Sequence, residues 1–430
     1  MQLTLRQQLT QFAHLLQSAL FPAVEEEIGP LGITSKRLIS TLSLIPLARF
    51  VPVARGWMGR PQKDRLAIAR AFVAKAVYDF PDTRDLLDRL RQDAQLRSIC
   101  GWQYARQIPH ESTFSRAFAE FAQMQLPQFV HQALIRETQQ HRLIGHIARD
   151  STDIEVREAA TPKQEPPQPQ SQPRPRSKGG KPRRPRKAGD PPTRLERQRN
   201  MALEQMLREL PCYCSYSAKK SRAGHKQYWR GYKLHLDVAD GQIPISAVLT
   251  AAHVHDSQAA IPLSTMTQQR VTALYEVMDA AYDAQEIMEH VRSQGRVPII
   301  DPKPFGWGRR KSVIVCNYPR QLSWAEQDRY RERTMVERVN ARLKDEFGGR
   351  HVRVRGAAKV MAHLMFGILA LSADQQTDFT HARRTPDARC VFEHSPETSP
   401  FRRGPDGRAS RRTLTEGYHR ATVGDYVADN

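Results

Sequence analysis

Cysteine is scarce in this chain, and a long apolar run is missing. Only five of the 430 residues are cysteine, and they are scattered and odd in number, which argues against a disulfide framework. Cys212 and Cys214 lie closer together than the cysteines of a zinc knuckle, so structural zinc is not expected. No uninterrupted apolar run approaches the roughly 18 residues of a transmembrane helix, and the N-terminus lacks a signal-peptide pattern. We therefore expect a cytosolic protein.

Acidic residues are also few relative to basic ones. The chain has 66 Lys and Arg against 45 Asp and Glu, a formal net charge of +21. The most basic segment, residues 162–192, holds nine basic and two acidic residues, so a charge of +14 remains on the rest. Neutralising phosphates releases their condensed counterions, so a surplus spread this widely favours nucleic acid as the partner over a membrane surface.

The first third of the chain is predicted to be helical. Residues 62–78 and 82–100 carry apolar side chains at three- and four-residue spacing. Residues 108–122 are typical of a turn followed by a helix, with Ser112 as the N-cap. This pattern suits either a helix-turn-helix DNA reader or an ordinary helical hairpin.

The remainder alternates between strand and helix patterns. Strands are predicted at residues 143–152, 231–238, 243–249, 273–278 and 297–300, and helices at residues 194–209, 256–270, 284–294, 323–347 and 357–375. The Asp240-Gly241 turn joins two of the strands into a hairpin. The order predicts an α/β fold: a mixed sheet flanked by helices, preceded by an all-helical domain.

These patterns also give domain boundaries. We expect a helical domain over residues 1–140 and a catalytic core that begins with residues 143–161 and continues over residues 193–378. Residues 162–192, with ten prolines, and the polar residues 379–430 cannot bury enough apolar surface to fold alone, and both are predicted to be disordered.

Three acids stand out by their positions. Asp150 and Asp279 are predicted to close their strands, and Glu337 lies on the predicted helix 323–347. Carboxylates so placed can converge on hard cations such as Mg²⁺, and two such ions promote phosphoryl transfer. By contrast, His253, His255 and Asp256 are interpreted as a strand end leading into a helix cap rather than as metal ligands.

The helix around Glu337 carries further chemistry. Tyr330, Arg333, Glu337 and Lys344 fall within about 60° of one another on one face of a regular helix. The opposite face is apolar and should pack inward: Met335, Val336, Val339, Leu343 and Phe347. An acid flanked by cations suits a site in which the acid holds a metal and the cations hold phosphate oxygens, although a solvated, salt-bridged face would show the same pattern.

The spacing Tyr330-x2-Arg333-x3-Glu337-x6-Lys344 matches, without departure, the Y-R-E-K signature of DDE transposases from bacterial insertion sequences, of the broad insertion-sequence-four type. The segments RTMVERVNARLKDEFGGRHVRVRG and AHLMFGILAL resemble the C-terminal block of that family. VMDAAYDAQEI and IARDSTDI resemble the blocks that carry the second and first aspartates, while WRGYKLHLDV and LTAAHVHDSQAAIPL resemble the stretch between. The likeness covers about residues 143–375.

The resemblance implies an RNase H-like catalytic core that cuts and joins DNA. It places the catalytic, metal-binding acids at Asp150, Asp279 and Glu337, with Mg²⁺ or Mn²⁺, two ions, as cofactor. It assigns Tyr330, Arg333 and Lys344 to DNA phosphates. It also implies that the N-terminal helices bind the terminal inverted repeats, that target DNA is the second substrate, that a homodimer forms the synaptic complex, and that the protein works at the bacterial nucleoid.

Some alternatives stay open. Asp153 is a rival for the first aspartate, and Asp283 and Asp301 are weaker rivals for the second. The Pro/Arg-rich insert departs from the family pattern and leaves the position of any insertion domain open. A catalytically inactive DNA-binding protein, domesticated or architectural, would share the basic charge, although none of the acids is missing. A tyrosine recombinase with Tyr330 as nucleophile would need a helical catalytic domain.

Overall fold

The computed structural model describes residues 5–52, 63–161, 192–220, 225–302 and 322–381. The segments predicted to be disordered, residues 162–192 and 379–430, lie almost entirely outside these ranges. The described residues belong to one compact unit.

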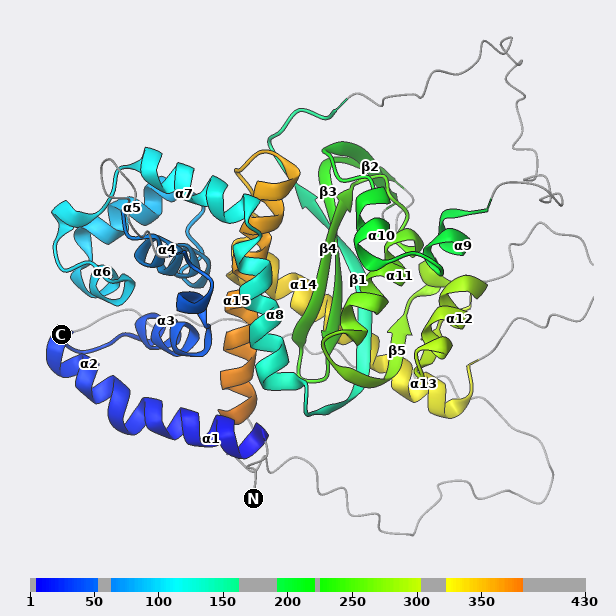
Figure 1. Cartoon of the computed structure of the whole chain (residues 1–430), viewed down its shortest axis with the longest axis horizontal. Helices are drawn as coiled ribbons and strands as arrows, with labels where there is room; N and C mark the ends of the chain where they lie inside the picture. The colour runs from blue at the N-terminus through cyan, green and yellow to red at the C-terminus, as the bar shows by residue number, and fades with distance from the viewer. Residues whose placement is uncertain (1–4, 53–62, 162–191, 221–224, 303–321, 382–430) are drawn as a thin grey trace, which may run out of the picture. The chain divides into compact units, whose positions relative to one another are not determined.

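A mixed six-stranded sheet forms the centre of the second half (Figure 1). Its strands are β1 (Leu143–Glu155), β2 (Ser215–Lys220), β3 (Lys226–Ala239), β4 (Ile243–Ala251), β5 (Thr272–Met278) and β6 (Val297–Ile300). β1, β5 and β6 run parallel, and β3 lies antiparallel to β1 on its other side. β2 pairs with the first half of β3 and β4 with its second half. The predicted fold class is confirmed; β2 was missed because its sequence, SYSAKK, holds only two apolar residues.

Helices cover both faces of this sheet. They are α9 (Arg194–Gln198), α10 (Leu203–Glu209), α11 (Ser257–Gln268), α12 (Gln285–Ser293), α13 (Trp324–Tyr330), α14 (Thr334–Glu346) and α15 (Ala357–His381). Successive side chains of a strand point to opposite faces. Leu234 and Leu236 of β3 accordingly join the core cluster of α14 and α15, whereas Asp237, the residue after Leu236, accepts from the Thr267 hydroxyl of α11.

The first third of the chain is helical throughout its described residues. It contains α1 (Leu5–Leu15), a π-helical turn (Leu16–Leu20), α2 (Phe21–Ile28), α3 (Ile33–Leu44), α4 (Arg65–Val77), α5 (Thr83–Gln92), α6 (Ala94–Cys100), α7 (Glu111–Gln123) and α8 (Leu126–Gln139). The single helix predicted over residues 82–100 is divided at Asp93, whose carboxylate accepts from the Leu96 N–H and starts α6. Ser112 is not the N-cap of α7; His110 is, through its ring Nδ1.

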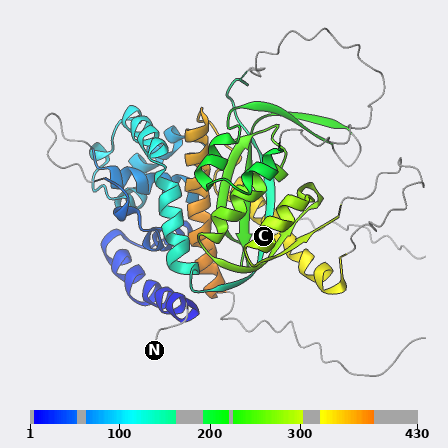
Figure 2. The ribbon, with the colours of Figure 1, turned by 45° about the vertical axis from the view of Figure 1, so that its right-hand side comes forward.

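Helix α15 joins the two halves. Within the described part of the chain, its segment Ala357–Thr377 alone is long and apolar enough to cross a membrane, but 72% of that window is buried. It packs against α4, α7, α8 and β4, and Figure 2 shows α8 and α15 side by side next to the sheet. Its composition is therefore explained as that of a central core helix.

Candidate active site

The parallel strands bring the first two predicted acids to neighbouring positions. In the register of β1, β5 and β6, Arg149 is opposite Met278, which is opposite Ile300. Asp150 is the next residue of β1 and Asp279 is the first residue after β5, so the two acids follow paired positions of adjacent strands. β5 ends before Asp279 as predicted. The prediction that Asp150 closes its strand is wrong, because β1 stays paired with β3 as far as Glu155.

The two aspartates disfavour each other's charge. Burial raises the pKa of Asp150 to about 6, and the Asp279 carboxylate adds to that shift. Burial likewise raises the pKa of Asp279, with Asp256 and Asp301 contributing in the same direction. Each acid keeps one backbone donor, from the Ser151 N–H at 2.7 Å and the Ala281 N–H at 2.9 Å. Such a pair of partly desolvated carboxylates is stabilised by a cation.

Glu337 lies near this pair but is held by an arginine. Its carboxylate is 2.7 Å from the Arg333 guanidinium. Burial lowers the pKa of Arg333, but the Glu337 and Asp150 carboxylates more than offset this and the net pKa is raised. Glu337 and Asp150 line the same open pocket, of about 380 Å³, together with Ser151, Thr152, Asn340, Ala341, Lys344, Asp345 and Arg350.

The helix that carries the Y-R-E-K residues is not continuous. A 3₁₀ turn, Arg331–Arg333, separates α13 from α14, so the helix predicted over residues 323–347 is in fact two. The predicted apolar face of α14 is buried in full, from Met335 to Phe347. Burial raises the pKa of Tyr330 at the end of α13. Lys344 contacts Asp153, with its Nζ 3.2 Å from Oδ1, so the rival for the first aspartate is already ion-paired.

The donor chemistry fits a divalent metal, although the described residues do not assemble a complete ligand set. Among the described residues, no group of three or more His, Cys, Asp or Glu is arranged to hold a metal ion. Asp150, Asp279 and Glu337 nevertheless supply the hard oxygen donors that Mg²⁺ and Mn²⁺ prefer. The Glu337 carboxylate is turned to Arg333, so it would have to exchange that partner for a metal.

Comparison with known proteins decides the family. Residues 141–373, more than half of the chain, match the family model described as a transposase DDE domain. The chain belongs to the DDE transposase family. Residues 35–120 also match a model described as a transposase domain, DUF772. The mixed sheet with flanking helices agrees with the RNase H-like core of DDE transposases, which are generally dependent on divalent metals.

The chain is also similar to two curated relatives. Both are described as "Probable transposase for insertion sequence element ISH11", from two strains of Halobacterium salinarum. Each is 26% identical to this chain over 148 residues, which is 32% of this chain and 45% of the relative. The chain thus covers less than half of the length of the curated relatives that it matches. No solved structure matches the chain.

A further acid, Asp256, which the sequence analysis did not assign to the site, lies beside the aspartate pair. The Asp256 carboxylate accepts from Lys233 Nζ and from Ser151 Oγ, each at 2.9 Å. Burial raises the pKa of Asp256, but Lys233 outweighs it and the net pKa is lowered. Asp256 is the N-cap residue of α11, in agreement with its interpretation as a helix cap, but its side chain forms no capping hydrogen bond. It orients the strand next to Asp150 instead.

Two tryptophans differ in their exposure to solvent, and two histidines form hydrogen bonds to serines. Trp229 is buried, at 7% exposure, whereas Trp324 is 91% exposed. His253 and His255 bond to serine hydroxyls through Nδ1, at 3.0 and 2.8 Å, and neither belongs to a metal-binding group among the described residues.

The chain also buries a charge network directly beneath Asp150. Arg149 is fully buried, and its guanidinium donates to both carboxylate oxygens of Asp237 at 2.7 and 2.8 Å. It also lies 3.0 Å from Glu276, which Arg296 pairs as well. Burial lowers the pKa of Arg149, but the two carboxylates outweigh it and the pKa is raised. This network links β1, β3 and β5 under the first aspartate.

Proposed function

We propose that this chain is an active transposase that cuts DNA at the ends of an insertion sequence and joins the freed 3′-hydroxyl to target DNA. The observation that carries the proposal is the placement of Asp150 and Asp279 at neighbouring strand positions, with Glu337 in the same pocket as Asp150. Acids in this arrangement suit the binding of hard cations at a phosphodiester.

Each proposed residue has a definite task. Asp150, Asp279 and Glu337 hold two Mg²⁺ or Mn²⁺ ions, which when bound activate water and stabilise the leaving oxygen. Arg333 moves from the Glu337 carboxylate to a phosphate oxygen of DNA. Tyr330 and Lys344 position neighbouring phosphates, and no covalent bond between protein and DNA is needed.

The same proposal extends to the partners. The helical residues 1–140 bind the terminal inverted repeats, residues 143–161 and 193–378 form the catalytic core, and a homodimer forms the synaptic complex at the nucleoid. The net charge of +21 supports DNA as the partner. A tyrosine recombinase is disfavoured because Tyr330 lies beside a mixed sheet that carries acids, not in a helical catalytic domain.

A second candidate is an inactive DNA-binding protein. The Arg333–Glu337 ion pair favours it, because the third acid is neutralised by a side chain of the protein itself. The two candidates predict the same DNA binding and differ in cleavage.

Metal removal separates them. Supercoiled plasmid carrying both element ends is incubated with the native chain in Mg²⁺, in Mn²⁺ or in EDTA. An active transposase nicks at the element ends in either metal, and in EDTA it binds the ends without cutting. End binding without cleavage in any metal would establish the inactive candidate, and metal-independent cleavage would exclude the acids as metal ligands.

The raised pKa of Asp150 predicts a pH dependence of metal binding. A carboxylate with a pKa of about 6 is mostly protonated at pH 5 and mostly ionised at pH 7, and only the ionised form binds metal. Mn²⁺ affinity, measured by titration calorimetry, is expected to be about tenfold weaker at pH 5 than at pH 7. Any Mn²⁺ binding that remains in Asp150→Asn should lack the part of the pH dependence that comes from this carboxyl. Equal Mn²⁺ affinity of the native chain at pH 5 and pH 7 would contradict the prediction.

A further inference from the structure

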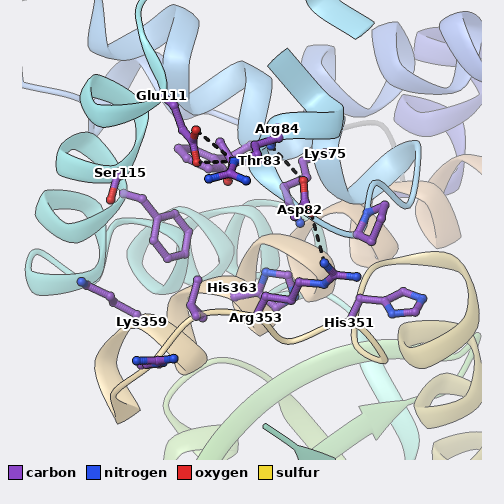
Figure 3. Close-up of a pocket in the computed structure, with 15 residues that line it drawn as sticks. Lys75, Asp82, Thr83, Arg84, Glu111, Ser115, His351, Arg353, Lys359 and His363 are labelled. Carbon is purple, nitrogen blue, oxygen red and sulfur yellow. Dashed lines mark hydrogen bonds and ion pairs between the residues drawn. The ribbon is translucent and has the colours of Figure 1, made fainter. Parts of the chain in front are cut away.

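A second polar pocket lies outside the candidate active site. It has a volume of about 530 Å³ and is open to solvent. Three segments form it: the end of α4 with the start of α5, the first half of α7, and residues 351–363, which connect α14 to α15 and begin α15 (Figure 3). The pocket is therefore built where the N-terminal helices meet the C-terminal part of the catalytic region.

Positive charge is in surplus in this pocket. Its lining contains two acids, and both are paired within it: Arg353 Nη1 is 3.2 Å from Asp82 and Arg84 Nε is 3.2 Å from Glu111 (Figure 3). Three further cations also line it, namely Lys75, Arg355 and Lys359. The surplus is three charges when Lys75 is protonated.

Two of these cations are available to an external anion. Among the described residues, none forms an ion pair with Arg355 or Lys359, and Arg355 is exposed. Lys75 is different: its Nζ donates to the Phe80 carbonyl at 2.8 Å, and burial lowers its pKa to about 8. Lys75 thus adds positive potential from the floor, while Arg355 and Lys359 offer N–H donors at the rim.

The basic pocket adjoins the catalytic pocket along the chain. Arg350 lines the catalytic pocket, and the next residue, His351, lines the basic one together with Arg353 and Arg355. Val352 between them is buried and anchors the connection to the core. Five residues span at most roughly 17 Å, which is the axial length of about five base pairs of DNA.

We propose that this pocket binds backbone phosphates of the element end, a few base pairs from the cut. The inference rests on the proposed function, because it takes the DNA strand in the catalytic pocket as its starting point. Arg and Lys are the side chains that hold phosphate oxygens, and the half-exposed pairs of Arg353 and Arg84 contribute little stability, so they can open to a phosphate as well. Contacts of this kind fix the register of the duplex and do not read its sequence.

DNA binding by the full-length chain in EDTA tests the pocket separately from catalysis. Fluorescence anisotropy of a labelled linear duplex carrying one element end gives affinity over a series of salt concentrations. Arg355→Gln with Lys359→Gln should weaken binding about tenfold or more. The slope of log affinity against log salt should fall by about 0.9 for each phosphate that the variant no longer neutralises.

Two further variants make the result specific. Arg208→Gln with Arg292→Gln removes the same charge from exposed positions on α10 and α12 that line neither pocket, and should leave the slope unchanged. Arg355→Lys with Lys359→Arg keeps both charges and should show the native salt slope. The inference would be overturned if Arg355→Gln with Lys359→Gln kept the native salt slope, or if the control pair lost as much affinity. Neither outcome would bear on the proposed cleavage. Failure of the native chain to bind the end duplex would overturn both.

Discussion

Glu337→Gln is expected to reduce metal-dependent cleavage at the element ends by about a thousandfold or more, with DNA binding retained. Glutamine has nearly the shape of glutamate but cannot supply a negatively charged ligand. The change also releases the Arg333 guanidinium from its 2.7 Å ion pair, so that this cation is left to the Asp150 and Asp279 carboxylates. A second of the proposed metal ligands is thus ion-paired at the same time.

The control comes from the same stretch of chain. Glu332→Gln makes the same substitution at an exposed residue of the 3₁₀ turn before α14, which lines neither pocket. Cleavage of the two-ended plasmid by this variant should stay within about twofold of native. If Glu337→Gln cleaves as fast as the native chain, Glu337 has no part in the mechanism. If both variants lose cleavage equally, the loss comes from the local charge and not from a metal ligand.

The sequence predicted the inward face of α14 well, because that face follows from periodicity within one helix. It also predicted that Asp279 directly follows its strand, but it wrongly placed Asp150 at the end of β1, which continues to Glu155 beside β3. What it missed depends on contacts between distant segments. The bond from Ser151 to Asp256 and the one from Lys233 to Asp256 exist only once β1, β3 and the start of α11 are in register.

The helical periodicity of the sequence also did not predict that Glu337 pairs with Arg333. Arg333 and Glu337 were predicted to share a face, one for phosphate and one for metal, but residues four apart on a helix are in reach of each other. The two side chains form this ion pair, with 2.7 Å between the guanidinium and the carboxylate. Strand β2 was missed for the opposite reason: it gains its order from pairing with β3, not from a pattern of its own.

Arg149→Met is expected to lower the free energy of unfolding by about 3–5 kcal/mol, because removing one member of a buried charge network leaves another without compensation. The Asp237 carboxylate, fully buried, would keep only the Thr267 hydroxyl at 2.6 Å, whereas Glu276 retains Arg296. A loss of this size is a large fraction of the roughly 5–15 kcal/mol that stabilises a domain. Urea denaturation followed by far-UV circular dichroism measures it.

A double variant distinguishes charge from packing as the cause. In Arg149→Met with Asp237→Leu, no unpaired carboxylate remains at that position, and apolar side chains fill most of the space. Replacing a buried pair in this way is often close to neutral, so the double variant should recover most of the stability that the single one loses. Arg292→Met, at an exposed position on α12, should be within about 0.5 kcal/mol of native. If the double variant is as unstable as the single one, Arg149 acts through its packing between β3 and β5, and the network of charges beneath Asp150 is not what holds these strands together.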